Sequence, residues 1–177
     1  MKKKNDIVFL NNIDDGITRL TLNDENSGNS LSEEMMTALE DKIKSLSLDK
    51  RVKVIIIDAI GSIFSSGHNL KEITNARQND DKGETYFKNL FDQCSQLMQL
   101  IVNCPKPIIA EVDGIATAAG CQLVASCDLA ISSSEARFAT PGVNIGLFCS
   151  TPMVALSRNV KKKDAMKMLL TGDLINA

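Results

Sequence analysis

Hydrophobic and polar residues alternate along the chain with two periods, one typical of strands and one typical of helices. Short apolar runs bounded by Gly, Asp or Pro predict strands at residues 7–10, 17–22, 52–59, 108–112 and 128–132. Apolar positions at helical spacing predict helices at residues 31–46, 70–76, 86–102, 119–126, from about 151, and 164–170. Strands that alternate with helices of crossover length predict an α/β fold with parallel strands and right-handed connections.

Two of these segments carry more specific expectations. Val52 to Ala59 is a nearly continuous β-branched run, which is typical of a strand buried on both faces. Ser30 and Glu33 have the spacing of a capping box ahead of the first long helix. We therefore expect Ser30 to cap that helix.

The composition is that of an ordinary globular protein. The chain has 177 residues, 44% hydrophobic and 24% charged, with a net charge of −2, which suits one domain with a substantial core. Basic clusters occur at Lys2–Lys4 and at Lys161–Lys163. Short charge runs of this kind are usually solvated surface, and a nucleic-acid contact is the alternative.

The cysteines and the apolar runs bear on the compartment. Five cysteines without CxxC spacing argue against a full disulfide framework, and four of them lie in apolar runs, so reduced core thiols are expected. Apolar stretches fall short of the ~18 residues that span a bilayer. The charged first six residues show no secretory signal. A cytoplasmic protein without membrane contact is therefore expected.

Common catalytic motifs are missing, but two glycine-containing segments could bind an anion. The sequence has no GxxxxGK[ST], GxGxxG, HExxH or GxSxG, and with His68 as its single histidine it does not support a Cys/His metal cluster. Residues 64–72 and 113–123 each place small residues in a turn between a predicted buried strand and a helix. Unpaired N–H groups in such turns suit a developing negative charge. The alternative is that both are ordinary tight turns.

These two segments resemble the paired signatures of the crotonase (enoyl-CoA hydratase/isomerase) family, in the family's order. The first signature is matched by Phe64, Gly67, Asn69, Leu70 and Glu72. The second is matched by Gly114, Ala116, Gly120, Cys121, Leu123, Cys127 and Asp128. Residues 22–32, 138–141 and 171–172 are similar to further family segments, so the resemblance covers nearly the whole chain.

The resemblance implies a crotonase-like (ClpP/crotonase) α/β spiral of ββα units that binds an acyl-CoA thioester. In such a protein the backbone N–H groups of His68 and Ala119 form an oxyanion hole, which stabilises a thioester enolate. The His68 ring itself is interpreted as an ordinary exposed side chain. Further residues expected to border the substrate are Ser65, Ser66, Gly67, Asn69, Leu70, Gly120, Gln122 and Gly142. No metal or separate cofactor is expected, because CoA is part of the substrate.

The chain departs from the family where hydratases carry their acid/base groups. Gln122 and Gly142 stand at the two glutamate positions, and the family's glycine triplet reads Ala118-Ala119-Gly120. Each general acid or base is worth ~10²–10⁴-fold in rate, so the two-glutamate hydration mechanism is not expected. The Gln122 amide could hydrogen-bond a substrate carboxylate or thioester, and packing in the pocket wall is the alternative.

Three functions remain open at this point. The chain is an isomerase or lyase that uses the enolate, a catalytically silent acyl-CoA binder or regulatory subunit, or a decarboxylase of malonyl-type CoA esters. The last is suggested because some family decarboxylases also carry a histidine after the first-turn glycine, as His68 does. The other polar residues near the two segments are interpreted as structural, capping or loop residues: Glu72, Glu111, Asp113, Asp128, Asn144 and Ser150.

The end of the sequence bears on assembly. Family members generally continue well beyond the position of Gly172, in helices that complete the pocket and pack between subunits. A single acyl-CoA-binding domain over residues 1–177, with that helical region absent or truncated, is therefore expected. A homotrimer or dimer of trimers is expected only if the region is present.

Overall fold

The computed structural model describes residues 6–177, with the side chains of residues 12–14 left out, and it contains two sheets. The five-stranded sheet has the order β1 (Val8–Ile13), β2 (Ile17–Leu22), β3 (Val54–Ala59), β5 (Ile108–Val112), β7 (Leu129–Ser132). The four-stranded sheet has the order β4 (Ile63–Ser65), β6 (Ile115–Thr117), β8 (Arg137–Ala139), β9 (Ile175–Asn176). β1 runs antiparallel to β2 and β9 to β8, and the other described pairings are parallel.

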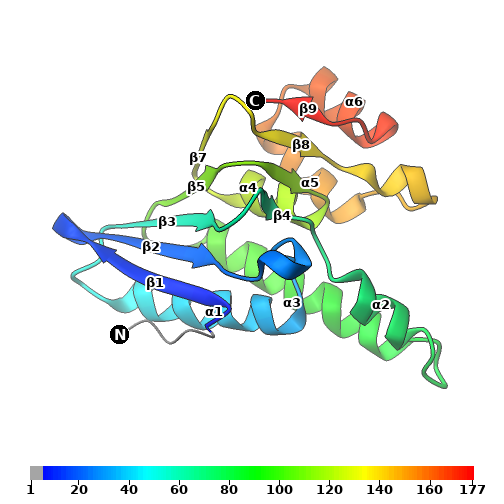
Figure 1. Cartoon of the computed structure of the whole chain (residues 1–177), viewed down its shortest axis with the longest axis horizontal. Helices are drawn as coiled ribbons and strands as arrows, with labels where there is room; N and C mark the ends of the chain where they lie inside the picture. The colour runs from blue at the N-terminus through cyan, green and yellow to red at the C-terminus, as the bar shows by residue number, and fades with distance from the viewer. Residues whose placement is uncertain (1–5) are drawn as a thin grey trace.

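Pairs of strands followed by helices repeat along the chain. The helices are α1 (Glu33–Leu48), α2 (Leu70–Ala76), α3 (Glu84–Val102), α4 (Ala119–Ser126), α5 (Ser150–Asn159) and α6 (Lys162–Thr171), with 3-10 turns at Asp14–Gly16, Glu25–Ser27 and Pro141–Ile145. In the pairs β3/β4, β5/β6 and β7/β8, the first strand joins the larger sheet and the second joins the smaller one (Figure 1). The predicted spiral of ββα units with mostly parallel strands is therefore confirmed.

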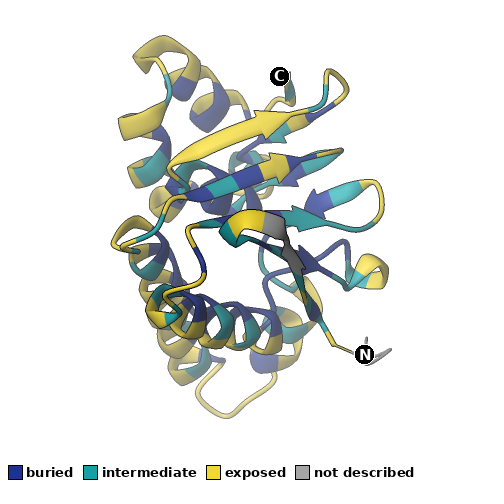
Figure 2. Ribbon diagram, turned by 90° about the vertical axis from the view of Figure 1, so that its left-hand side faces the viewer, coloured by how far each residue is buried: buried dark blue, intermediate teal, exposed yellow. Residues whose placement is uncertain are grey.

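The main core lies between the five-stranded sheet and the helix pair α1 and α3 (Figure 1). Apolar residues spaced three or four apart put one stripe of each helix against the sheet, where Ile55, Ile57 and Ile108 are fully buried. Figure 2 shows this layer as buried, in contrast to the exposed outer turns of the helices. Each fully buried Leu, Ile or Met contributes about 1.5–3 kcal/mol, so this layer supplies most of the packing energy.

The start of α1 corrects the capping prediction. The side chain of Ser32, rather than that of Ser30, accepts a hydrogen bond from the Met35 N–H (3.1 Å). The helix begins later because the Leu31 N–H donates to the Gly67 carbonyl (2.8 Å), in a bridge that keeps this stretch extended. The capping-box interpretation of Ser30 and Glu33 is therefore wrong by two residues.

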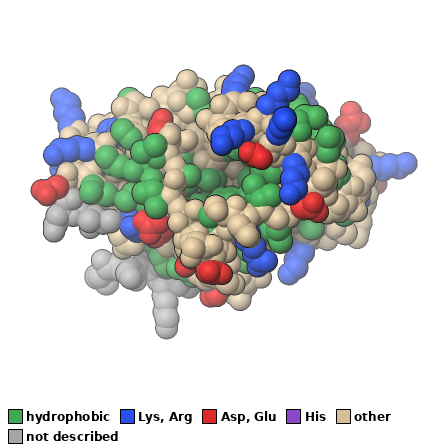
Figure 3. All heavy atoms as spheres, turned by 90° about the horizontal axis from the view of Figure 1, so that it is seen from above, with side chains coloured by type: hydrophobic (Ala, Val, Ile, Leu, Met, Phe, Trp, Pro, Cys, Tyr) green, Lys and Arg blue, Asp and Glu red, His purple; other side chains and the backbone are tan. Residues whose placement is uncertain are grey.

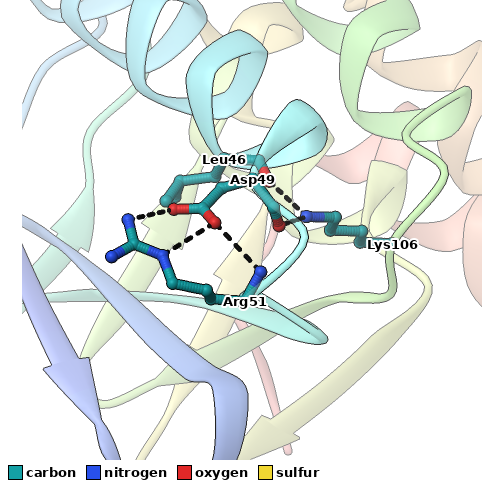
Figure 4. A network of polar contacts seen from close by, with 4 residues as sticks. All are labelled: Leu46, Asp49, Arg51 and Lys106. Carbon is teal, nitrogen blue, oxygen red and sulfur yellow. Dashed lines mark hydrogen bonds and ion pairs between the residues drawn. The ribbon is translucent and has the colours of Figure 1, made fainter.

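The end of α1 is held by a cation from a distant loop (Figure 4). Lys106 donates to the carbonyl oxygens of Leu46 (2.5 Å) and Asp49, where the helix dipole favours a positive charge. The Asp49 carboxylate pairs with Arg51 (2.7 Å), and this lowers the pKa of Asp49 to about 2. The loop before β5 is thereby tied to the end of the first long helix.

The outer face of the larger sheet is polar, which corrects the prediction for residues 52–59. Ile55 and Ile57 are fully buried, but Ile56 on the other face is only half-buried. On that face Arg19 of β2 donates to Asp58 (2.5 Å) and Glu111 (2.9 Å), spanning three strands and raising the pKa of the arginine through these carboxylates. An ion-paired network cannot pack as an apolar core, so the strand is not buried on both sides.

Two features concern the surface of the molecule. Within residues 6–177, no helix is both long enough and apolar enough to cross a membrane. The second basic cluster, Lys161–Lys163, lies exposed at the start of α6, whereas Lys2–Lys4 lies outside the described residues.

Candidate functional site

The two glycine-containing segments meet at one edge of the smaller sheet. β4 and β6 are parallel neighbours, with Ile63 beside Ile115 and Ser65 beside Ala116. Because both strands end at the same edge, the bends that follow them, residues 66–69 before α2 and residue 118 before α4, lie side by side. The sequence placed these bends after the longer strands β3 and β5 and missed β4 and β6, which actually aim them.

The bends touch at Gly67. Its φ of +87° lies in the left-handed region, and a Cβ there would lie 2.8 Å from the Ala118 Cβ and 3.1 Å from the Ala119 nitrogen. Thr117 also donates a hydrogen bond from its hydroxyl to the Ser66 carbonyl (3.1 Å). Only glycine at position 67 lets the first bend approach the second this closely.

The second bend contains a strained alanine. Ala118 has a φ of +51° and a ψ of −122°, a combination that glycine adopts freely and that costs other residues about 1–3 kcal/mol. The surrounding structure holds it there, because its N–H donates to the Ala139 carbonyl (2.9 Å) and its carbonyl accepts from the Gln122 N–H (3.1 Å). Ala118 is one of the two positions, with Ala119, at which the sequence departs from the glycine triplet of the resemblance.

Two main-chain N–H groups are left unpaired where the bends meet. The N–H groups of Ser66, Gly67 and Ala118 all donate hydrogen bonds within the chain. Within residues 6–177, no acceptor lies in reach of the N–H of His68 or of Ala119. Unpaired backbone N–H groups in partly buried positions are rare, and Ala119 additionally begins α4, where the helix dipole is positive.

The other residues predicted for the first bend mainly hold it in shape. Ser65 is fully buried, and its hydroxyl accepts from the Gly67 N–H (3.4 Å). Ser66 donates to the Ser27 carbonyl (3.2 Å), and Asn69 caps α2 by accepting from the Lys71 N–H (3.0 Å). Leu70 is largely exposed at the first position of α2.

Gly120 sets the distance between α4 and β4. A Cβ at this position would overlap the Ser65 carbonyl oxygen and lie 2.7 Å from the Ser65 Cβ. The helix therefore presses its first turn directly against the strand that leads into the first bend.

The ring of His68 is largely enclosed, so its interpretation as an ordinary exposed side chain is wrong. Its edge meets the ring of Phe91 at 5.8 Å between centroids and 83° between planes, and its Nδ1 lies 3.4 Å from the Leu31 carbonyl. Nε2 is buried and has no hydrogen-bond partner among the described residues. Burial lowers the pKa of His68, so the ring is neutral at neutral pH.

A cavity of about 630 Å³ lies between α3, α4 and α5. Its lining includes Phe91, Met98 and Val102 from α3, Gln122, Ala125 and Ser126 from α4, and Val154, Ala155 and Arg158 from α5. Gln122 is only 7% exposed, and its Oε1 finds no hydrogen-bond donor within residues 6–177. A buried amide without a partner is unusual and requires an explanation, for which a ligand in the cavity is the direct candidate.

Sequence reasoning found Gln122 but missed the other walls of this cavity. Phe91 and Met98 belong to the apolar pattern that predicted the helix at residues 86–102, and no role at a site was assigned to them. Phe91 is in fact 44% exposed, and an aromatic residue at the margin of a buried stripe was the signal that could have identified a cavity wall.

The position of the second family glutamate has no room for a side chain. Gly142 is buried in the 3-10 turn Pro141–Ile145, and a Cβ there would overlap the Leu147 carbonyl oxygen and lie 2.8 Å from the Cys149 sulfur. The loop that follows thus fills the space into which a residue at 142 would extend.

The remaining acidic candidates are occupied by structural contacts. Glu72 accepts from Tyr86 (3.3 Å), and Asp128 accepts from the Ile108 N–H (2.8 Å). Glu111 is held by Arg19, as described above. These contacts agree with the interpretation of Asp128 and Glu111 as structural residues and of Glu72 as a surface or capping residue.

The other polar and metal-binding candidates add no chemistry at the bends. Asn144 and Ser150 are exposed, and so is Asp113. All five cysteines are free thiols, and burial raises the pKa of Cys121 to about 12 and that of Cys94 to about 11. Among the described residues, no group of three His, Cys, Asp or Glu side chains could hold a metal ion.

Comparison with known proteins extends this description. Residues 12–177 match the family described as "Enoyl-CoA hydratase/isomerase". The chain is 52% identical over 162 residues to "Enoyl-CoA hydratase domain-containing protein 3, mitochondrial" of Xenopus laevis, covering 92% of this chain and 53% of the relative. It is 33% identical over 156 residues to "Putative enoyl-CoA hydratase" of Thermus thermophilus, covering 88% of this chain and 60% of the relative.

Solved structures show the same architecture. The crystal structure of human enoyl-CoA hydratase domain-containing protein 3 superposes with a TM-score of 0.89 at 46% identity, covering 97% of this chain and 66% of that chain. An enoyl-CoA hydratase from Mycobacterium smegmatis superposes with a TM-score of 0.90 at 44% identity, covering 98% and 65% of the two chains. The chain spans about half the length of the curated vertebrate relatives that it matches.

Proposed function

The chain belongs to the enoyl-CoA hydratase/isomerase family, and on this basis we propose that it binds an acyl-CoA thioester and stabilises the thioester enolate. The N–H groups of His68 and Ala119 are the proposed donors to the thioester oxygen. The observation that carries this proposal is that both amides lack an acceptor within residues 6–177, although their bends are in contact.

The stabilisation follows from where charge develops during the reaction. When a proton or a carboxyl group leaves the acyl C2 atom, electron density moves onto the thioester oxygen. Two fixed N–H donors stabilise that oxygen more in the transition state than in the ground state, and each is worth about 3–4 kcal/mol. The positive end of α4 acts in the same direction. Because these are main-chain donors, the neutral His68 ring is not required to donate.

The acid/base chemistry of a hydratase is not part of the proposal. Gln122 carries no titratable proton, and Gly142 has no side chain and no space for one. We expect crotonyl-CoA hydration at least ~10³-fold slower than in a homologue with both glutamates, because general acid–base groups are worth that order. A comparable rate, measured by loss of the enoyl absorbance, would contradict our interpretation of these two positions.

A CoA thioether tests the proposed oxyanion hole directly. A thioether of the same chain length keeps the CoA and the alkyl chain but lacks the carbonyl oxygen. We expect calorimetry to show tighter binding of the saturated thioester, by about 10-fold, because charge-free hydrogen bonds contribute about 1 kcal/mol or more. Equal affinities would leave the two amides without the proposed role.

A catalytically silent acyl-CoA binder is the second candidate. It is favoured by the absence of a carboxylate at both positions, Gln122 and Gly142, where hydratases of the family carry their glutamates. Turnover of a panel of CoA esters separates the candidates, since binding without product formation supports the silent binder. Decarboxylation of malonyl-type esters belongs in the same panel because it needs no base.

The remaining expectations stay predictions. Ser65, Ser66, Gly67, Asn69 and Leu70 are proposed to border the CoA, with Gly120, Gln122 and Gly142 near the acyl group. The cytoplasmic location expected from the sequence differs from the mitochondrial designation in the names of the vertebrate relatives. A homotrimer or dimer of trimers is proposed only for a chain that includes the C-terminal helical region, and gel filtration with light scattering tests it.

A further inference from the structure

The cavity follows α4 away from the two bends. Ala119, Gln122 and Ser126 lie three and four residues apart, which places them on one face of the helix. Gln122 and Ser126 both line the cavity, together with Asp128 just beyond the helix. If the oxygen of a thioester accepts a hydrogen bond from the Ala119 N–H, an acyl chain that runs along this face passes Gln122 first and then reaches the end of α4.

The length of this path limits the chain that it can hold. From Ala119 to Ser126 the helix rises about 10 Å, which is the length of an extended chain of about eight carbon atoms. The walls on both sides of the path are apolar, with Phe91 and Val102 on α3 facing Val154 and Ala155 on α5. Phe91 is 44% and Val154 45% exposed, so a ligand has apolar surface to cover here.

A cation stands at the far end of the path. Arg158 lines the cavity, and its guanidinium group makes no ion pair with any residue in the 6–177 range. The neighbouring segment adds positive charge: residues 158–167 contain five cations and one acid, namely Arg158, Lys161, Lys162, Lys163, Asp164 and Lys167. Figure 3 shows Lys and Arg side chains beside exposed apolar groups on the face above these helices.

The acid at this end of the cavity is already engaged. Asp128 also lines the cavity, but its Oδ2 accepts a hydrogen bond from the Ile108 N–H (2.8 Å), which ties it to the start of β5. It does not lie within ion-pair distance of Arg158. The arginine therefore remains available to an anion from solution.

We propose that the cavity takes the acyl chain of an α,ω-dicarboxylic acid monothioester of about eight carbons, whose free carboxylate pairs with Arg158. This inference rests on the proposed function, because the thioester end must sit at the two bends. A planar guanidinium binds a carboxylate through two parallel hydrogen bonds, which a plain alkyl end cannot form. The Gln122 Oε1 beside this path also has no hydrogen-bond donor within residues 6–177.

The test compares two CoA thioesters of equal length by calorimetry, the eight-carbon monoacid and the eight-carbon diacid. In the unmodified protein at low salt we expect the diacid to bind about five-fold tighter, a preference typical of an exposed ion pair. Arg158→Met should abolish that preference, expressed as the ratio of the two affinities in the same variant. Arg137→Met on β8 removes another exposed arginine that does not line the cavity, and should keep the preference.

The outcomes separate this inference from the function on which it rests. If both thioesters bind with equal affinity, or if Arg158→Met retains the preference, the dicarboxylate assignment is wrong although acyl-CoA binding stands. If neither thioester binds, the proposed function itself fails. Arg158→Glu is a second test variant. Because its carboxylate would repel the free carboxylate of the diacid, we expect the diacid to become the weaker ligand, and an unchanged preference would overturn the assignment.

Discussion

The two bends at the candidate site both contain a residue with a positive φ, but they use different residue types for it. The first reaches positive φ with Gly67, and the second does so with Ala118. Glycine is required at position 67 for two reasons: its φ is positive, and there is no space for a Cβ. At position 118 the side chain occupies the gap that Gly67 leaves. The pair is therefore complementary, and a methyl group is tolerated on one side only because the other side has none.

The comparison also separates space from strain. Gly67 is unstrained but surrounded, whereas Ala118 has room but holds an unfavourable backbone conformation. Hydrogen bonds at its N–H and its carbonyl overcome that cost. Backbone strain therefore lowers the stability of the fold at the second bend and not at the first, and this strained conformation positions the Ala119 N–H.

The largest expected effect is that of Gly67→Ala. The added methyl group would lie 2.8 Å from the Ala118 Cβ at a φ of +87°, so crowding and strain add to about 3 kcal/mol of lost stability. Urea denaturation measures the loss, and acyl-CoA affinity should fall with it because the bends must separate. Gly146→Ala is the control: its φ is +77° but nothing lies within 4 Å, so only about 1 kcal/mol is expected. Equal losses in the two variants would show that crowding between the bends is unimportant.

The loss of stability caused by Gly67→Ala should be smaller when the methyl group of Ala118 is also removed. In Gly67→Ala/Ala118→Gly the new methyl group takes the place of the old one, so we expect about 1 kcal/mol of favourable coupling in a double-mutant cycle. Additive losses would mean that the Ala119 nitrogen, 3.1 Å away, limits position 67 rather than the Ala118 methyl group.

Ala118→Gly alone should change stability less again. It relieves the strained backbone but gives the unfolded chain more freedom, and the two terms leave a gain of up to about 1 kcal/mol. The unfolding midpoint in urea measures this gain. Ala118→Val provides the contrast, since a β-branched residue at this φ should destabilise the protein. A destabilised Ala118→Gly variant would show that the alanine is not strained.

The smallest expected effect is a pH dependence of stability that arises from the first bend alone, through His68. Burial lowers the pKa of His68 in the first bend below its usual 6.5, so below pH 6.5 the unfolded chain binds a proton more readily than the folded chain. Stability should therefore be complete above about pH 6.5 and fall as the pH drops toward the folded pKa. His68 is the only histidine, so urea midpoints at pH 7.5 and 5.5 report on it with little interference. His68→Gln should flatten the difference, and an unchanged slope would place its origin elsewhere.

Regular elements with strong periodicity could be predicted from the sequence. The bounds of β2, β5, α2 and α4 coincide with the predicted ranges. Turn or capping residues such as Gly16, Asn69, Pro107 and Asp113 mark an end of most of these segments. The strands of the smaller sheet were missed. β4 and β6 have only three residues each, too few to show a period, and pairing with distant neighbours creates them.

The candidate site was predictable to a similar degree. Glycine at 67 and the small residues at 118–120 identified both bends, because few residues fit such turns. The sequence could not show that Gly67 touches Ala118, nor that α5 closes a cavity over Gln122, since both depend on long-range packing. The enclosure of His68 was missed for the same reason, as Phe91 is 23 positions away.

The filled space beside Gly142 limits which side chains position 142 can accept. A glutamate at that position would collide with the Leu147 carbonyl, which is main chain and cannot rotate away. No single exchange at 142 is therefore accommodated without moving residues 143–149. Engineering a carboxylate at position 142 therefore requires rebuilding this loop first, even with the rest of the scaffold in place.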